Sequence, residues 1–188
     1  MKKEQRFIES TNLEVREEDG KRKIGGYAAV FNKLSEVLWN FREKIDRGAF
    51  KNSLKSKDIV ALWSHDSNVV LGRTGNGTLE LREDDHGLAF DLDLPNSPWG
   101  ENAFEAIKRG DVKGVSFGFT VKKEDWDRGE NTIRTLKEID LIEISPTVFP
   151  AYKQTEVDAR KIFENWESEN PKTMSRNARR LALAKMEG

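Results

Sequence analysis

The chain has 188 residues, of which 36% are hydrophobic and 35% charged, and its formal net charge is −1. This length and composition fit one small domain with a modest core, and the balanced charge gives no basic field for nucleic acid. The chain contains no cysteine, which excludes disulfides, thiolate metal sites and a cysteine nucleophile.

No stretch approaches the roughly 20 apolar residues of a membrane-spanning helix, and the first residues lack a signal-peptide pattern. We therefore expect a protein that acts in the cytoplasm, without membrane or nucleic-acid partners. No phosphate-binding loop or zinc motif occurs either, so we expect no cofactor and no metal.

The first third of the chain predicts strands and one short helix. Residues 1–24 are polar, and an acid-rich turn at residues 17–20 could join two paired segments. Small and β-favouring residues predict buried strands at residues 25–31 and 59–63. Residues 48–54 predict a short helix.

The middle of the chain predicts a hairpin followed by a helix. Residues 78–82 and 88–94 alternate apolar and polar side chains on either side of a turn, as a hairpin requires. A helix over residues 98–110 has Ser97 as its expected N-cap and Gly110 at its end. Its packed face is expected to carry Trp99, Ala103, Ala106 and Ile107.

Strands are predicted again at residues 115–121 and, as one or two elements, at residues 132–148. The fold class is therefore α+β, mainly β, with about six or seven strands in a small closed or nearly closed barrel and packed helices. We place the domain at residues 1–160 and a basic helical tail at residues 161–188, with Thr173 capping the last helix.

Three residues could carry chemistry. His65 follows a predicted strand and precedes Asp66, a setting that suits a general base, although most single histidines are structural. Ser116 lies between two glycines, in letters that match the Gly-x-Ser-x-Gly elbow. A strand rather than a helix follows it, which excludes an α/β-hydrolase and leaves a glycine-rich structural strand as the alternative. Glu143 is the single carboxylate in an apolar run.

Glu143 would either orient a catalytic histidine or face solvent from a half-exposed strand. The other histidine, His86, lies in the turn-like segment Asp84–Gly87, and we interpret it as a turn residue. The neighbouring acids, Asp84 and Asp85, lack further ligands at useful spacing and are interpreted as solvated.

Six segments in order carry a family resemblance: GYAAVF (26–31), EKIDRGAF (43–50), SHD (64–66) with LGRT (71–74), EDDHGL (83–88), IKRGDVKGVSFGF (107–119) and EISPTVFPAY (143–152). Together they resemble the prohead protease family of tailed bacteriophages. The resemblance implies a barrel like that of the herpesvirus assemblins. It also implies a serine endopeptidase that cleaves scaffold and major capsid protein inside the procapsid, and itself.

Carried onto this chain, the resemblance implies that His65 is the base and Ser116 the nucleophile. Glu143 is the expected third member of the triad, with Asp66 and Asp140 as weaker substitutes. Backbone amides near residues 150–152 would bind the oxyanion.

The resemblance further implies a host bacterial cytoplasm, a possible homodimer and a tail that self-cleavage removes. The alternatives are a catalytically silent assembly factor on the same fold and an unrelated esterase that acts on small molecules.

Overall fold

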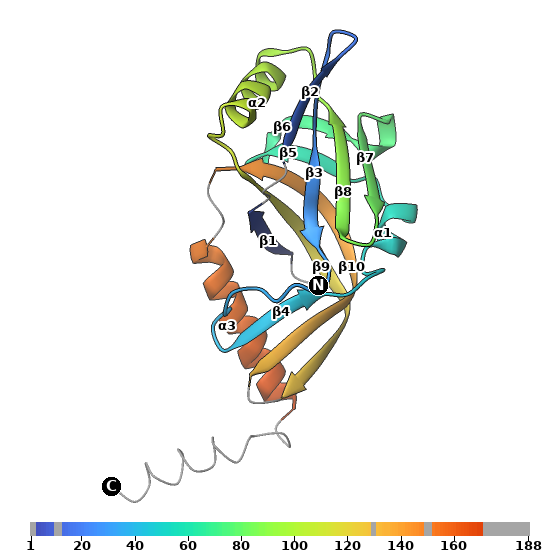
Figure 1. The fold of residues 1–188 in the computed structure, drawn as a ribbon. Coiled ribbons are helices and arrows are strands. Elements are labelled where there is room, and N and C mark those ends of the chain that lie inside the picture. Colours follow the sequence, from blue (N-terminus) through green and yellow to red (C-terminus); the bar gives the residue numbers. More distant parts are fainter. Residues whose placement is uncertain (1–2, 10–12, 129–130, 149–151, 171–188) are drawn as a thin grey trace, which may run out of the picture.

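The structure is a computed structural model that describes residues 3–9, 13–128, 131–148 and 152–170 (Figure 1). Its strands are β1 (Glu4–Glu9), β2 (Glu14–Glu18), β3 (Lys21–Val30), β4 (Phe41–Ile45), β5 (Val60–Trp63), β6 (Asp66–Arg73), β7 (Leu79–Glu83), β8 (Gly87–Asp93), β9 (Gly114–Arg128) and β10 (Thr132–Thr147). Its helices are α1 (Lys51–Ser56), α2 (Pro98–Lys108) and α3 (Tyr152–Glu169), with a 3₁₀ turn at Thr74–Asn76.

The strands form two sheets. The six-stranded sheet has the order β1-β9-β10-β5-β6, and β4 pairs in parallel with residues 132–136 at the start of β10. The four-stranded sheet has the order β2-β3-β8-β7. Neither sheet closes on itself among the described residues, so the mainly β, α+β class is confirmed whereas the closed barrel is not.

One hydrophobic core joins the two sheets. It combines Ile24, Leu88 and Phe90 of the four-stranded sheet with Phe117 and Ile144 of the six-stranded sheet, all of them buried. The alternating pattern of β8 and the apolar run of β9 place these side chains in one layer. The expected core is therefore present, enclosed by two open sheets, and a second, smaller cluster around Phe41 and Phe163 lies apart from it.

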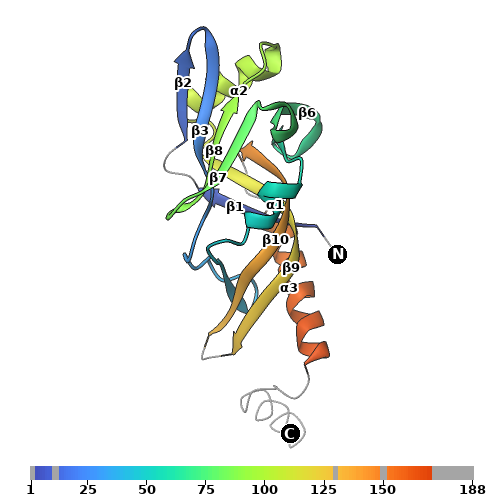
Figure 2. The same cartoon turned by 90° about the vertical axis from the view of Figure 1, so that its right-hand side faces the viewer.

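The predicted hairpins are present. Strands β2 and β3 meet at Asp19 and Gly20, which both have positive φ, as a two-residue type I′ turn requires. Strands β7 and β8 pair in register around the turn that carries His86. Strands β9 and β10 pair in a long ribbon that was not predicted; β9 extends beyond its predicted end at residue 121, and β10 is one continuous strand (Figures 1 and 2).

Helix α2 confirms the predicted span with two corrections. Ala103 and Ile107 are buried, but Trp99 is 55% exposed and does not belong to the packed face. Ser97 is the N-cap residue by position, yet its side chain makes no capping hydrogen bond. Trp99 lies in the first turn of α2, and its side chain projects into solvent.

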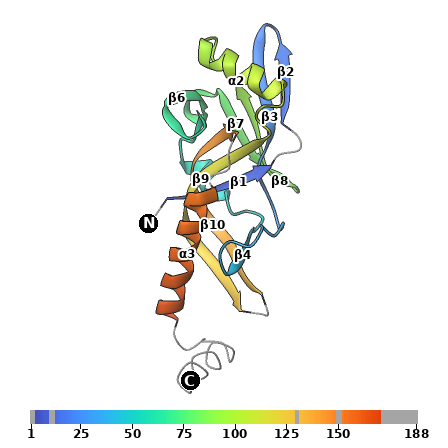
Figure 3. The same cartoon turned by 90° about the vertical axis from the view of Figure 1, so that its left-hand side faces the viewer.

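Helix α3 packs beside the far half of β9 and β10 (Figures 1 and 3). Phe163 stacks on Phe41, while Trp126 stacks on Trp166 at 4.4 Å between ring centroids. The helix runs through residue 160 without a break, and the cap expected at Thr173 lies outside the described residues. None of the described helices is long and apolar enough to cross a membrane.

Candidate functional site

His65 is presented by the tight turn between β5 and β6. Trp63 pairs with Asp66, so Ser64 and His65 form a two-residue hairpin loop, and their φ values are 50° and 65°. Both residues therefore adopt the left-handed conformation of a type I′ turn, which side chains other than Gly, Asn and Asp disfavour. The backbone N–H of Ser64 donates to the carbonyl of Pro146, which ties the turn to β10.

Glu143 holds the His65 ring. Its Oε1 lies 2.8 Å from His65 Nδ1, and its side chain is 1% exposed. Ser145 donates its hydroxyl to the other carboxylate oxygen of Glu143 at 2.8 Å. The same hydroxyl accepts the backbone N–H of His65 at 3.2 Å, so Ser145 links the carboxylate to the turn.

Gly118 provides the space that this carboxylate occupies. It faces Glu143 across the β9–β10 ladder, and a Cβ at residue 118 would lie 2.4 Å from Glu143 Oε1. Because real Cβ atoms do not approach oxygens so closely, any other residue here would displace the carboxylate. The second glycine of the Gly114–Gly118 segment is therefore explained by the acid on the neighbouring strand.

Ser116 lies on the same face of the sheet as Glu143. It pairs with Ser145 on β10, and facing residues of an antiparallel ladder direct their side chains to the same side. Its side chain is fully buried, and its hydroxyl donates to the backbone carbonyl of Arg6 at 2.9 Å. The remaining nitrogen of His65, Nε2, is buried and has no hydrogen-bond partner in the described part of the chain.

The carboxyl of Glu143 has a lowered pKa. Burial alone would raise that pKa, but the hydrogen bond and charge of His65, the Ser145 hydroxyl and the Lys3 ammonium outweigh burial. Lys3 reaches this carboxylate from the segment before β1, with its Nζ 3.3 Å from Oε1. Glu143 is thus an anion near neutral pH, able to fix the ring and to stabilise a positive charge on it.

The structure brings His65 and Glu143 together and places Ser116 on the adjoining strand. It does not bring in the weaker substitutes for the acid, because Asp66 accepts from Asn68 and Asp140 pairs with Lys57 and Lys122. His86 lies in the β7–β8 turn, where its N–H and that of Gly87 donate to Asp84.

Two further contributors escaped the sequence reasoning. Ser145 stands in an apolar run where a serine suggests only a tolerated small residue, and Lys3 is one of many lysines. The alternation of β10 offers a signal for Ser145, because residues 143 and 145 must share a face. Of the segment near which oxyanion-binding amides are expected, residues 150 and 151 lie outside the described residues, and Pro150 has no N–H to donate.

A buried carboxylate, the histidine that it holds and a buried serine on the adjoining strand are the residue types of a nucleophilic triad. With Nδ1 engaged by the carboxylate, Nε2 is left to take a proton from a hydroxyl. In the described residues no group of three or more acidic, histidine or cysteine side chains is arranged to hold a metal ion.

Known proteins resemble this chain in sequence and in fold. The sequence profile of the caudovirus prohead serine protease family matches residues 11–169. The chain is 32% identical over 156 residues to the prohead protease of Enterobacteria phage HK97, covering 80% of this chain and 65% of that protein. It thus spans slightly less than two thirds of the length of this relative.

The fold is similar to that of the capsid assembly protease of bacteriophage T4, with a TM-score of 0.50 and 11% identity. The match covers 78% of this chain and 99% of the T4 chain, and at that identity it concerns the fold alone. Because the family profile runs through most of the chain, including β5, β9 and β10, this chain belongs to the caudovirus prohead serine protease family.

Proposed function

We propose that the chain is a serine endopeptidase that cleaves segments of the scaffold and major capsid proteins inside the procapsid of a tailed phage. Ser116 is its nucleophile, His65 its general base and Glu143 the acid that orients the histidine. The observation that carries the proposal is the buried Glu143 carboxylate on His65 Nδ1, with Ser116 on the same face of the next strand. Membership of the prohead protease family supports the choice of substrates.

The reaction would proceed through an acyl-enzyme. As the Ser116 oxygen bonds to the carbonyl carbon of the peptide, its proton passes to His65 Nε2, and Glu143 stabilises the imidazolium. The carbon–nitrogen bond then breaks as His65 returns that proton to the leaving amine. Water, activated by the same histidine, hydrolyses the ester and restores the serine.

One observation favours a second candidate, the catalytically silent assembly factor. The Ser116 hydroxyl is fully buried and donates to Arg6 rather than to His65. A serine held in this way permanently would contribute only to packing between β1 and β9.

Substitution of the serine separates the two candidates. We expect Ser116→Ala to abolish cleavage of co-expressed scaffold and major capsid protein, because no other hydroxyl replaces the attacking oxygen. Gel electrophoresis and mass spectrometry of the products measure the cleavage, with Ser56→Ala, an exposed serine on α1, as the matched control. Cleavage by Ser116→Ala at the rate of the control would exclude Ser116 as nucleophile.

A further inference from the structure

Strand β1 lies along the edge of β9 that carries Ser116. It pairs antiparallel with residues 114–119, and Phe7 faces Ser116. β1 is itself the outermost strand of the six-stranded sheet, so β9 would present an open edge without it. An open strand edge is the surface on which proteins bind extended peptides by strand addition.

The contacts of β1 are made with the candidate catalytic groups themselves. The carbonyl between Arg6 and Phe7 accepts the Ser116 hydroxyl at 2.9 Å, which places a peptide bond directly beside the candidate nucleophile. Lys3, just before the strand, pairs with Glu143. A backbone carbonyl beside the serine is the position that the bond to be cleaved must occupy.

Buried charges hold β1 in place. Glu4 and Arg6 are 6% and 8% exposed, and they face Glu43 and Arg134, which are 4% and 2% exposed. Arg6 donates to Glu43 through Nε at 2.6 Å, and Arg134 donates to Glu4 through Nη1 at 2.8 Å. Two charges on β1, two residues apart, thus match two opposite charges on β4 and β10.

Glu43 and Arg134, the two residues whose charges face β1, are paired with each other independently of β1. Arg134 also donates to Glu43 at 2.8 Å and to Glu124 through Nε, so these charges stay paired when β1 leaves. Water would then solvate Glu4 and Arg6. Release of β1 exchanges these ion pairs for hydration of the same charged groups, which offsets part of their loss.

Space for a strand of different sequence exists beside β1. A cavity of about 290 Å³ borders Arg6, Phe7 and Phe117 and extends to Leu34 in the segment before β4. Side chains larger than those of β1 therefore have room on this side of the strand.

We propose that β1 is a self-inhibitory strand in the substrate position along β9. When β1 is displaced, Glu43 and Arg134 select an extended peptide with an acidic residue followed two positions later by an arginine. This inference rests on the proposed function for its biological meaning. The binding that it describes is measurable without catalysis.

The first test measures binding of a fluorescent peptide with the sequence of residues 3–9, Lys-Glu-Gln-Arg-Phe-Ile-Glu, to the full chain carrying Ser116→Ala. Adding Glu4→Ala and Arg6→Ala removes the charges that hold β1, so the site is open more of the time. We expect the peptide to bind about ten-fold more tightly or better, since apparent affinity scales with the open fraction.

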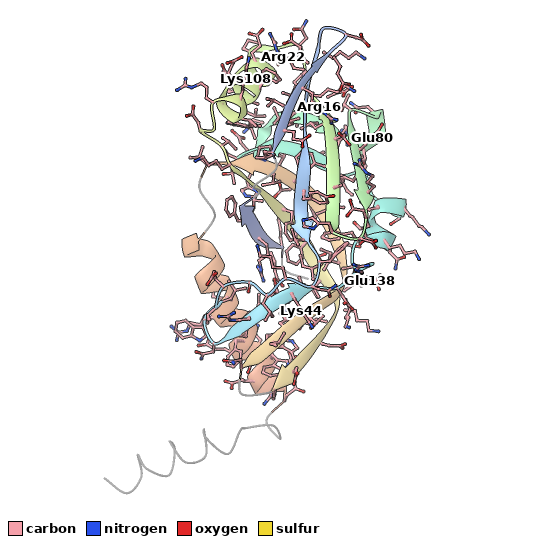
Figure 4. All side chains as sticks on the ribbon, viewed as in Figure 1. Arg16, Arg22, Lys44, Glu80, Lys108 and Glu138 are labelled. Carbon is pink, nitrogen blue, oxygen red and sulfur yellow. The ribbon has the colours of Figure 1, made fainter. Side chains whose placement is uncertain are left out.

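The matched control removes one exposed acid and one exposed arginine elsewhere, Glu80→Ala with Arg109→Ala, and should bind as the Ser116→Ala parent does. Glu80 projects from β7, remote from β1 (Figure 4). Binding of the peptide by the Glu4→Ala/Arg6→Ala variant no more tightly than by this control would overturn the proposal.

A disulfide lock gives a second, independent test. Because the chain has no cysteine and residues 7 and 116 face each other, Phe7→Cys with Ser116→Cys should form one bond that fixes β1 on β9. We expect no peptide binding by the oxidised protein. Reduction should restore binding to the level of Ser116→Cys alone, and equal binding by the two redox forms would contradict the proposal.

The charge rule is tested with the peptide Lys-Arg-Gln-Glu-Phe-Ile-Glu, in which the acid and the arginine are exchanged. It would place like charges on Glu43 and Arg134, and we expect at least about ten-fold weaker binding. Equal affinity for the two peptides would refute the selection by charge. Because these assays use Ser116 variants, absence of proteolysis by the Glu4→Ala/Arg6→Ala variant with Ser116 intact would refute the proposed function and leave this inference standing.

Discussion

Glu143 is the residue on which the site depends. It receives His65 Nδ1 on one oxygen and the Ser145 hydroxyl on the other, with Lys3 near the first. The sequence marked Glu143 as unusual because a single carboxylate interrupts an apolar strand. Ser145 did not stand out in the same way, because a hydroxyl that is hydrogen-bonded can be buried at little cost in free energy. Only the folded structure shows its two hydrogen bonds.

Ser145 is predicted to position Glu143 and the histidine turn. Ser145→Ala removes a hydrogen bond to a charged group, an interaction of about 1.5–3 kcal/mol, and we expect cleavage to slow about ten- to hundred-fold. Ser145→Thr keeps the hydroxyl and should restore most of the rate. Single-turnover cleavage and thermal unfolding are measured together.

The control for Ser145 is Ser53→Ala, which removes another buried serine whose hydroxyl accepts the backbone N–H of Leu141. That variant should lose stability and keep its cleavage rate per folded molecule. If Ser145→Ala lost stability alone in the same way, its role would be only structural.

Among the elements, the β5–β6 hairpin carries the clearest sign of strain. Ser64 and His65 both occupy the left-handed region, which costs about 1–2 kcal/mol for each such residue. The turn is anchored to β10 through Pro146 and Ser145. Strain that surrounding structure maintains is common where a side chain must be aimed at a reaction.

Ser64→Gly should therefore stabilise the protein. Relief of the left-handed strain exceeds the extra entropy of glycine in the unfolded chain, and we expect the melting temperature to rise by about 2 °C or more. Ser67→Gly, in the exposed part of the adjoining strand β6, should lower the melting temperature. Differential scanning calorimetry measures both, and a fall in melting temperature for Ser64→Gly would contradict the strain.

The hairpins and α2 were predictable because alternation, turn residues and a proline at the helix start are local signals. Strand β1 was not predicted, because its buried side chains, Glu4 and Arg6, look like solvated charges until Glu43 and Arg134 are beside them. The barrel prediction was too specific for a related reason. Short strands indicate sheets, but whether a sheet closes depends on pairings between distant segments.

At the scale of the whole molecule, two buried acids couple stability to pH. Burial would raise the pKa of Glu4, but hydrogen bonds and charges from Arg134 and Arg6 outweigh burial and lower that pKa. The pKa of Glu143 is lowered in the same way by its own partners. A group with a lowered pKa contributes stability that is fully present above its unfolded value near 4.5. That contribution is lost as the pH falls through the lowered folded value.

Glu4→Gln should flatten this acid dependence. We expect the variant to be less stable than wild type at pH 7 but to lose less unfolding free energy between pH 5 and pH 3, because one linked proton is removed. Urea unfolding at several pH values measures the slope, with exposed Glu80→Gln as the control for loss of a negative charge. A slope equal to that of wild type would show that Glu4 is not linked to folding.

The two hydrophobic clusters have different structural roles. The sheet core positions β5, β9 and β10 around the candidate triad, whereas the aromatic cluster of Phe41, Trp126, Phe163 and Trp166 fixes α3 beside the far end of the ribbon. The site is thus built by strands remote in sequence and braced by one continuous pair, β9 and β10.

The central claim, that Ser116 and His65 act as one catalytic unit, is tested most directly by cleavage rates for Ser116→Ala, His65→Ala and the double variant. Each single substitution should lower the rate by about a thousand-fold or more, and the double variant should be no slower than the slower single one, because the unit is already lost. Losses that multiply in the double variant, or wild-type cleavage by Ser116→Ala, would contradict the account.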